Sequence, residues 1–377
     1  MKKMRATVKE LEDKFEETAF KLTQERSDFL LPQVVDFVKT ERWINLRPEY
    51  QRRSVWDVPK RSLFIESLLL NIPIPPIFLF EQALSRYEVM DGQQRLTSVV
   101  DFYQNGFPLK GLEKWSELNG LRFRDLPETL QRGLDRRRIS ATVLLAESTK
   151  KKDFTRNDIR KLVFERLNTG GQTLNAQELR NCLYAGYFND QLSLLASQEI
   201  FTEIWEIPSY AENVDAHGFA APVLRENPLY KRMIDCQIVL RFFALREVNN
   251  IKGSVRAMLD DCMERNLNIS EPDAAAFGAQ YLEVLALAHR IFGKRVFRIR
   301  RSKGKWELSV PLYDAIMIAV LRLWNERERL VADKAQIGER IEKLLDNPDA
   351  YKVVVGKPNT AQAIRDRLNI VTAAVKG

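Results

Sequence analysis

The chain has 377 residues, and its 59 lysines and arginines exceed its 51 aspartates and glutamates by 8 charges. Hydrophobic residues make up 45% of the sequence, which suffices for packed cores and excludes general disorder, and the length predicts two domains. The three cysteines are widely spaced, which excludes a disulfide framework and a cysteine-based zinc site. We expect a cytoplasmic protein without a secretory signal or a membrane-spanning segment, whose basic charge is compatible with a polyanionic partner.

The beginning of the chain is predicted to be helical. Apolar residues at helical spacing predict a charged amphipathic helix over residues 1–30, and Pro32 opens a second, shorter helix that ends near Thr40. We therefore treat residues 1–39 as an N-terminal helical segment. Its apolar face permits contacts with the body of the protein or with a second copy of the chain.

The loop over residues 47–56 combines three arginines, a glutamine and two aromatic residues. Pro48 favours an extended or turned backbone here. Such a loop can present Arg52 to an anion while Tyr50 and Trp56 anchor the backbone. A surface loop held by aromatic residues has the same composition, and both interpretations stay open.

The stretch Asp91-Gly92-Gln93-Gln94-Arg95 is the most distinctive in the chain. Residues 87–90 favour a strand, Asp91-Gly92 is a turn signal, and apolar residues recur at helical spacing from 96 to 103. Asp91 is expected to cap the new helix. A helix start attracts anions, Gly92 allows a phosphate to approach the backbone, and Gln93, Gln94 and Arg95 add donors. The stretch predicts a phosphate-binding site, although an ordinary capped helix after a strand has the same pattern.

The pattern of residues 164–171 predicts the junction between two helices. The loop is rich in glycine, and the following helix has a capping-box pattern formed by Asn175 and Glu178. A well-formed helical hairpin explains these features. In the functional interpretation the loop forms a second wall of a ligand site, with Asn168 and Gly170 among the contacts.

From residue 186 the apolar pattern is mostly helical, with one strongly basic segment. Residues 293–305 contain seven lysines and arginines, and an alternating pattern places Arg298 and Arg300 on one side. The segment resembles a surface that contacts the phosphate backbone of DNA, although charge runs are often simply solvated. The candidate nucleic-acid contacts are Arg295, Arg298, Arg300, Arg301 and Lys303.

Histidine content argues against two classes of catalytic site. The two histidines, His217 and His289, are 289 − 217 = 72 residues apart and have no cysteine or histidine neighbours. A nuclease of the HNH type and a Ser-His-Asp triad both need a histidine base with nearby partners. We therefore expect neither in this chain.

Four motifs follow one another in the first half of the sequence. They are Tyr50-Gln51-Arg52 with Trp56, then Ile72-Pro73-Ile74-Pro75-Pro76-Ile77, then Asp91-Gly92-Gln93-Gln94-Arg95, then the segment 164–171 with Leu174 and Glu178. This ordered set resembles the GmrSD N-terminal domain family, which has a ParB/sulfiredoxin-like fold. The resemblance implies an α+β protein, with a small mixed ParB/sulfiredoxin-like core over residues 40–185 and a mostly α-helical domain over residues 186–377.

The resemblance also implies a function. The family is linked to nucleotide hydrolysis and to bacterial defence against phage, including restriction of modified DNA. Carried over, Asp91, Gln93, Gln94 and Arg95 form the central motif, with Arg52 and Asn168 near it. No cysteine precedes residue 182, so the redox chemistry of sulfiredoxins is excluded. Many members carry an HNH nuclease that this chain lacks, so we expect a separate nuclease or effector subunit.

Three functional hypotheses stay open. The favoured one is an NTP-hydrolysing module of a DNA-directed defence system, in which Asp91 and Arg95 are catalytic and Asp91 orients a water or holds Mg²⁺. A P-loop mechanism is excluded because no Walker A motif is present. The second hypothesis is a non-catalytic DNA-binding protein whose turn grips backbone phosphate. The third is a metal-dependent DNA nickase that uses acidic residues.

Overall fold

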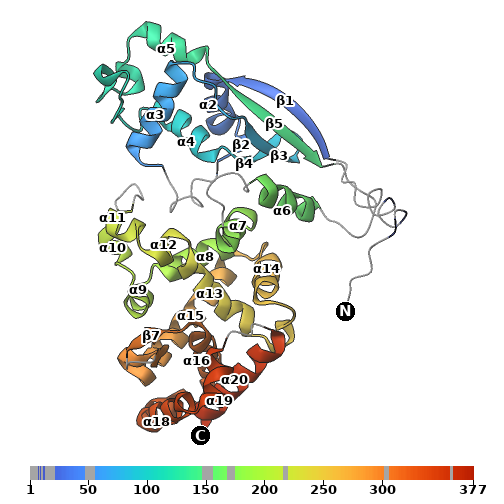
Figure 1. The fold of residues 1–377 in the computed structure, drawn as a ribbon, viewed down its shortest axis with the longest axis vertical. Coiled ribbons are helices and arrows are strands. Elements are labelled where there is room, and N and C mark those ends of the chain that lie inside the picture. Colours follow the sequence, from blue (N-terminus) through green and yellow to red (C-terminus); the bar gives the residue numbers. More distant parts are fainter. Residues whose placement is uncertain are drawn as a thin grey trace. The chain divides into compact units, whose positions relative to one another are not determined.

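The computed structural model describes most of the chain in two compact units. The described residues are 22–46, 56–146, 156–167, 175–214, 220–300, 305–356 and 360–377, together with Thr7, Lys9 and Glu12 (Figure 1). The first unit spans residues 1–173 and the second spans residues 174–377. The helix α7 (Ala176–Leu183) thus belongs to the second unit, whereas the boundary predicted from the sequence, at 185/186, places it in the first.

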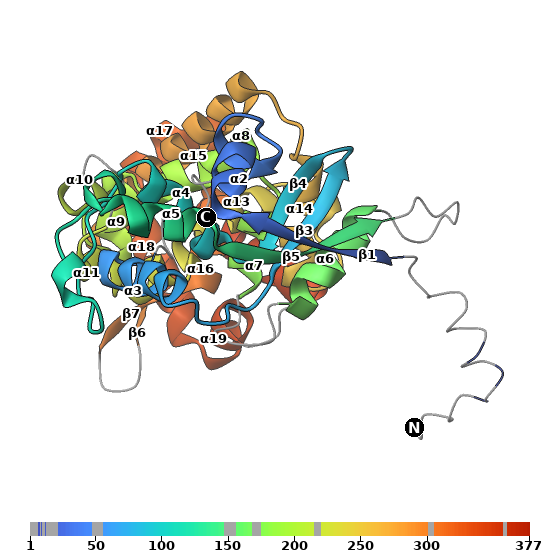
Figure 2. The same cartoon turned by 90° about the horizontal axis from the view of Figure 1, so that it is seen from above.

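A five-stranded mixed sheet forms the base of the first unit. Its strands are β1 (Leu22–Leu30), β2 (Ile44–Asn45), β3 (Ile77–Ala83), β4 (Arg86–Asp91) and β5 (Arg138–Ala146), in the order β1-β5-β3-β4-β2. The pairs β1–β5 and β3–β4 are antiparallel, and the pairs β3–β5 and β2–β4 are parallel. Figures 1 and 2 both show the long strands β1 and β5 running side by side. The predicted α+β class is confirmed.

One face of this sheet carries the core of the first unit. Ile77 and Leu79 of β3 point to this face with Val89 of β4 and Val143 of β5, because alternate side chains of a strand lie on the same side. Helices and short 3-10 turns supply the rest of the covering layer: α2 (Leu31–Lys39), α3 (Val58–Leu69), α4 (Gln93–Tyr103), η2 (Ser116–Leu118), η3 (Phe123–Asp125) and α5 (Glu128–Asp135).

The opposite face of the sheet contacts α6 (Arg156–Leu167) at β4. A buried ion pair joins the two elements, in which Arg160 Nε lies 2.8 Å from Glu88 Oε2 and Arg160 Nη2 donates to Glu88 Oε1 at 3.1 Å. Glu88 Oε2 also accepts a hydrogen bond from Gln82 Nε2 at 2.6 Å. Glu88 is therefore a buried carboxylate whose charge is balanced by Arg160 of α6 and which accepts a further hydrogen bond from β3.

The prediction of a helix over residues 1–30 is wrong for its last part, because Leu22–Leu30 is the strand β1. The helical spacing of apolar residues extended only to Leu22, and no residue between 23 and 28 continued it. All nine residues of β1 pair with β5, from Leu22 opposite Ala146 to Leu30 opposite Arg138. Pairing with a partner far along the chain thus overrode the local pattern. Residues 1–21, except for Thr7, Lys9 and Glu12, lie outside the described residues.

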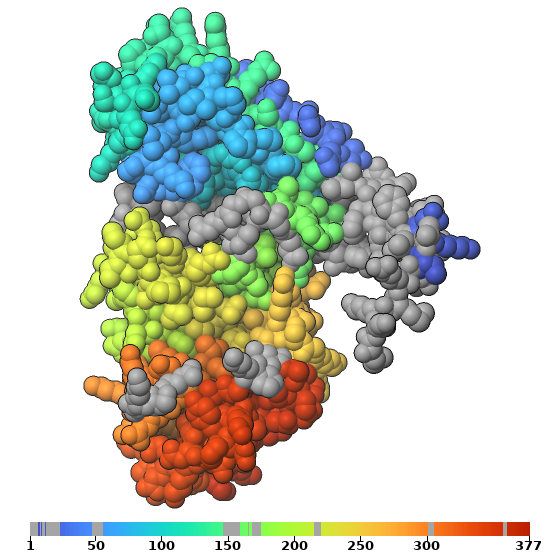
Figure 3. Space-filling view, viewed as in Figure 1, coloured from blue at the N-terminus to red at the C-terminus, as the bar shows by residue number. Residues whose placement is uncertain are grey.

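The second unit is helical, as the sequence predicts. Its further helices are α8 (Tyr187–Ala196), α9 (Glu199–Trp205), α10 (Tyr210–Asn213), α11 (Pro222–Arg225), α12 (Pro228–Lys231), α13 (Ile234–Leu245), η4 (Val248–Asn250), α14 (Val255–Arg265), α15 (Glu271–Phe292), η5 (Gly293–Arg295), α16 (Val310–Arg322), η6 (Trp324–Glu326), α17 (Arg327–Ala332), α18 (Lys334–Asp346), α19 (Pro348–Val355) and α20 (Ala361–Lys376). The strands β6 (Arg298–Arg300) and β7 (Trp306–Leu308) form a separate antiparallel pair. Figure 3 shows the described residues of both units in colour and the remaining ones in grey.

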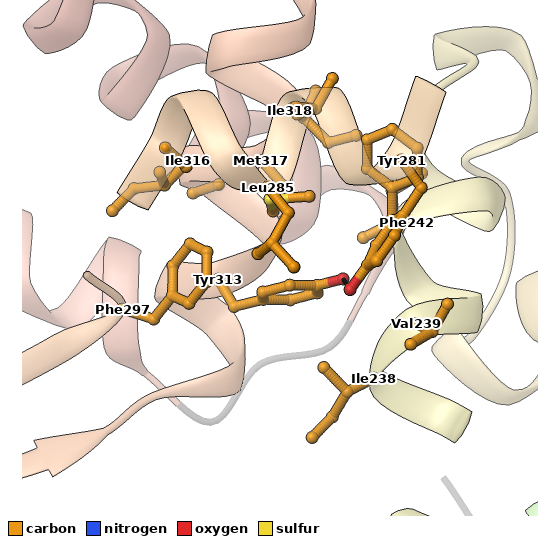
Figure 4. Close-up of a cluster of buried hydrophobic side chains, with 14 of the residues drawn as sticks. Ile238, Val239, Phe242, Tyr281, Leu285, Phe297, Tyr313, Ile316, Met317 and Ile318 are labelled. Carbon is orange, nitrogen blue, oxygen red and sulfur yellow. Dashed lines mark hydrogen bonds between the residues drawn. The ribbon is translucent and has the colours of Figure 1, made fainter. Parts of the chain in front are cut away.

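The core of the second unit surrounds α16. Residues 312–320 of this helix are all buried, and α13, α15 and α20 pack against it. The Tyr313 hydroxyl donates to the hydroxyl of Tyr281 at 3.1 Å, and Phe297 lies against the Tyr313 ring (Figure 4). Arg241 of α13 pairs with Asp314 inside this core. Across the described part of the chain, no helix combines the length and the apolar character needed to cross a membrane.

Candidate functional site

The turn between β4 and α4 is built around Gly92. Its φ of 94° lies in the left-handed region, which residues other than glycine rarely adopt. A Cβ atom at this position would lie 2.3 Å from Cγ2 and 2.9 Å from Cβ of the fully buried Ile77. Glycine is therefore required both by the backbone conformation and by the close approach of β3.

Asp91 does not cap α4, contrary to the prediction from the sequence. Gly92 is the N-cap residue and has no side chain to offer, and its carbonyl accepts the first helical hydrogen bond from the Leu96 N–H at 3.0 Å. Asp91 is still part of β4, where it pairs with Phe78, and so lies one residue too early for a cap. Its Oδ2 atom instead accepts a hydrogen bond from Arg95 Nη2 at 2.7 Å, and its side chain is 47% exposed.

Arg95 joins the turn to the loop that precedes β3. Its Nη1 atom donates to the carbonyl of Pro75, and its Nη2 atom reaches the carbonyl of Pro76 at 3.5 Å as well as Asp91. The Arg95 side chain is only 11% exposed, and this burial lowers its pKa while Asp91 acts in the opposite direction. Arg95 therefore organises the backbone around the turn as well as placing a positive charge beside it.

The two glutamines fix both flanks of the loop that carries Arg52. Gln93 Nε2 donates to the carbonyl of Leu46, and Gln94 Oε1 accepts a hydrogen bond from the Trp56 N–H at 2.9 Å. Leu46 and Trp56 are the last described residues before, and the first described residues after, the interval 47–55. The glutamine pair thus links this loop to the turn, a role that the sequence analysis did not predict for it.

A further cation lies beside Trp56, the residue whose N–H is bound by Gln94. Lys60, near the start of α3, places its amine 5.0 Å from the centre of the Trp56 ring, and its N–H donates to Asp57. Sequence analysis missed this lysine. The available signal was its position four residues after Trp56, on a helix that Asp57 caps.

Several predicted site residues lie outside the described residues. They are Arg52, Asn168 and Gly170 of the nucleotide site, Arg301 and Lys303 of the basic segment, and His217. Within the described ranges, no group of three or more histidine, cysteine, aspartate or glutamate side chains is arranged to hold a metal ion. The assignment of Asp91 to a metal ion stays a prediction.

The basic segment of the second unit has the predicted alternation. Arg298 and Arg300 lie on one side of β6, and Ile299 points into the core. Arg298 Nη2 pairs with Glu206 Oε1 at 2.5 Å, and Arg295 pairs with Glu342. The side chain of Arg300 is exposed. Part of the positive charge that we predicted from the sequence to contact nucleic acid is therefore balanced by glutamates within the protein.

Comparison with protein families gives a match for the first half of the chain. Residues 33–185 match the family described as GmrSD restriction endonuclease, N-terminal domain. The matched range contains the β4–α4 turn and the interval that carries Arg52. Neither the curated proteins nor the solved structures contain a match to the chain.

Proposed function

Residues 33–185 belong to the GmrSD restriction endonuclease N-terminal domain family, and from this premise we propose that the β4–α4 turn binds and hydrolyses a nucleoside triphosphate. The family assignment makes the chain a component of a restriction-type system of defence against phage. The observation that carries the proposal is the start of α4, where a glycine without side-chain bulk sits between an exposed carboxylate and a helix N-terminus.

The start of α4 supplies the binding chemistry. The first N–H groups of a helix and its dipole favour an anion, and α4 has eleven residues over which the dipole builds up. Gly92 allows the left-handed backbone of this turn, where a Cβ atom would collide with Ile77. In this proposal Arg95 of α4 and Lys60, which lies over the Trp56 ring, supply positive charge that offsets the charge of the phosphates.

Asp91 and Arg95 have different roles in the proposed hydrolysis. Asp91 orients the attacking water or holds Mg²⁺, which when bound neutralises charge on the phosphate oxygens. Arg95 positions Asp91 through their 2.7 Å hydrogen bond and holds the Pro75-Pro76 loop against the turn. In this proposal Arg52, Asn168 and Gly170, which lie outside the described residues, would supply further contacts to the nucleotide. Gln93 and Gln94 bind the described residues on either side of the interval that carries Arg52.

In the whole defence system, the nucleotide site would be coupled to contact with DNA. The basic segment around β6 contacts DNA, and cutting is assigned to a separate nuclease or effector subunit. Nucleotide binding or hydrolysis would then report DNA contact to that subunit. Support for this division comes from the family match in the first unit and from the exposed Arg300 in the second.

The test is release of phosphate from each of the four ribonucleoside triphosphates with Mg²⁺, with and without DNA. We expect turnover by the unmodified protein and a loss of about 100-fold in Asp91→Ala and Arg95→Ala, as for removal of one charge-stabilising group. Arg132→Ala is the matched control, since Arg132 is an exposed arginine of α5 that pairs only with Glu128 among the described residues. Folding of each variant is checked by circular dichroism.

The outcome also separates the two main hypotheses. Stimulation of turnover by DNA would support the sensing role. Absence of nucleotide binding with intact DNA binding would contradict the proposal and favour a non-catalytic protein that grips DNA phosphates. In that case binding should weaken steeply with salt, because counterions are released from DNA.

A further inference from the structure

A continuous groove follows the exposed side of α15 in the second unit. Three adjoining hollows of about 520, 650 and 460 Å³ lie along this helix. The first two share Glu283 and Trp324, and the second and third share Arg290. The helix residues that line them, from Ala276 to Arg290, recur every three or four positions, so they form one face ~21 Å long.

Two partly exposed tryptophans line the groove, each with an arginine over its ring. Trp324 follows α16, and the guanidinium of Arg327 lies 5.6 Å from its ring centre. Trp306 belongs to β7, and the guanidinium of Arg295 lies 5.3 Å from its ring centre. Aromatic faces beside fixed positive charge are the combination that holds the bases and phosphates of an unpaired strand.

The charge of the groove favours an anionic occupant. Six cationic side chains line the three hollows against four glutamates, a difference of 6 − 4 = 2. The cations are Arg290, Arg295, Arg298, Arg322, Arg327 and Lys334. One of the four glutamates, Glu342, is already paired with Arg295, whereas Arg298 is paired with a glutamate outside the groove.

Small residues keep the groove open. Ala276, Ala279 and Ala286 line it from α15, and Gly338 lines it from the middle of α18. A Cβ atom at Gly338 would meet no other atom within 4 Å, so packing does not require a glycine there. Glycine inside a helix is unfavourable relative to alanine. A glycine at this position leaves the third hollow wider than a larger side chain would.

We propose that this groove binds a short length of single-stranded nucleic acid, with bases stacked on Trp306 and Trp324 and phosphates held by the arginines. The inference rests on the proposed DNA-directed function and names the form of nucleic acid that the second unit takes. A paired duplex is disfavoured because its bases stack on one another and their faces are not accessible to the two tryptophans.

The experiment measures binding of a fluorescent oligothymidine, and of a duplex of equal length, to the full chain at one fixed low salt concentration. We expect tighter binding of the single strand, and a loss of about 10-fold or more in Trp324→Ala and in Trp306→Ala. The variants Trp324→Phe and Trp306→Phe keep an aromatic face and should recover part of the affinity. The assay contains no nucleoside triphosphate, so its result is independent of whether the β4–α4 turn hydrolyses one.

Gly338 provides a second test that does not remove any side chain. Gly338→Leu should fill the third hollow and weaken binding of the single strand, and Gly338→Ala should weaken it less, while both changes favour the helix. The proposal is overturned if the single strand does not bind. It is also overturned if single strand and duplex bind equally and the tryptophan and glycine variants change neither.

Discussion

Gly92 sets the geometry of the turn, and its replacement should be costly. Gly92→Ala places a methyl group against Ile77 and forces alanine into a left-handed backbone, so we expect a loss of at least about 1–2 kcal/mol in the free energy of unfolding. Gly133→Ala is the control, since Gly133 lies in α5 with no atom within 4 Å of its Cβ position. Urea unfolding of both variants tests the prediction, which equal stabilities would contradict.

Gln94 is expected to act as a hydrogen-bond acceptor for the backbone. Gln94→Leu cannot accept the Trp56 N–H and should cost about 1 kcal/mol, whereas Gln94→Glu retains an acceptor and should cost less. The measurement is hydrogen exchange at the Trp56 amide. Equal exchange rates in the two variants would show that the contact does not hold this end of the loop.

At the scale of elements, the attachment of α6 to β4 depends on Glu88 and Arg160. Arg160→Ala removes the cationic partner of the buried Glu88 carboxylate, which keeps the hydrogen bond from Gln82, and we expect a loss of about 3–5 kcal/mol in the free energy of unfolding. The double variant Glu88→Leu/Arg160→Leu should recover much of this loss because no buried charge is left. A double-mutant cycle measured by urea unfolding tests this, and purely additive losses would argue against the pair.

Most elements near the turn could be predicted from local patterns. The strands β3 and β4, the helix α4 and the strand β5 follow from alternation, helical spacing and turn residues. The strand β1 could not be predicted this way, because its partner β5 lies more than a hundred residues further along the chain. Its exposed charged residues are compatible with the open edge of a sheet and equally with a solvated helix, so residue types do not distinguish the two structures.

The turn was predicted in position but less completely in its internal contacts. The sequence placed a turn at Asp91-Gly92 before a helix, and the structure has both, while the binding roles of these residues stay predictions. The partners of Gln93, Gln94 and Arg95 are backbone groups of Leu46, Trp56, Pro75 and Pro76, which carry no distinguishing side-chain pattern. Contacts of this kind depend on tertiary structure and are not visible in residue types.

At the scale of the whole molecule, the core of the second unit should limit stability at high pH. Burial raises the pKa of Cys262 to about 12 and raises the pKa values of Tyr281 and Tyr313 above their ordinary range. The folded state binds these protons more tightly than the unfolded chain does. Its stabilisation is therefore complete below the pKa values of the unfolded chain, near 9 for cysteine and 10 for tyrosine, and is lost as the pH rises through the pKa values of the folded protein.

Unfolding in alkali should therefore coincide with ionisation of the buried tyrosines. We expect the far-ultraviolet circular dichroism to fall in the same pH interval in which the tyrosinate absorbance rises. Cys262→Ala should reduce the slope of stability against pH between about 9 and 12. Tyrosinate absorbance that rises fully while the helical signal is intact would contradict burial of Tyr281 and Tyr313.

The central claim is that a nucleotide binds at the start of α4, and hydrogen exchange tests it most directly. Exchange of backbone amides would be compared with and without a non-hydrolysable nucleoside triphosphate and Mg²⁺, using α5 as an internal reference within the same unit. The account predicts slower exchange in peptides that cover residues 91–97, and loss of this protection in Asp91→Ala. Saturating nucleotide without protection at these residues, or protection confined to the second unit, would contradict it.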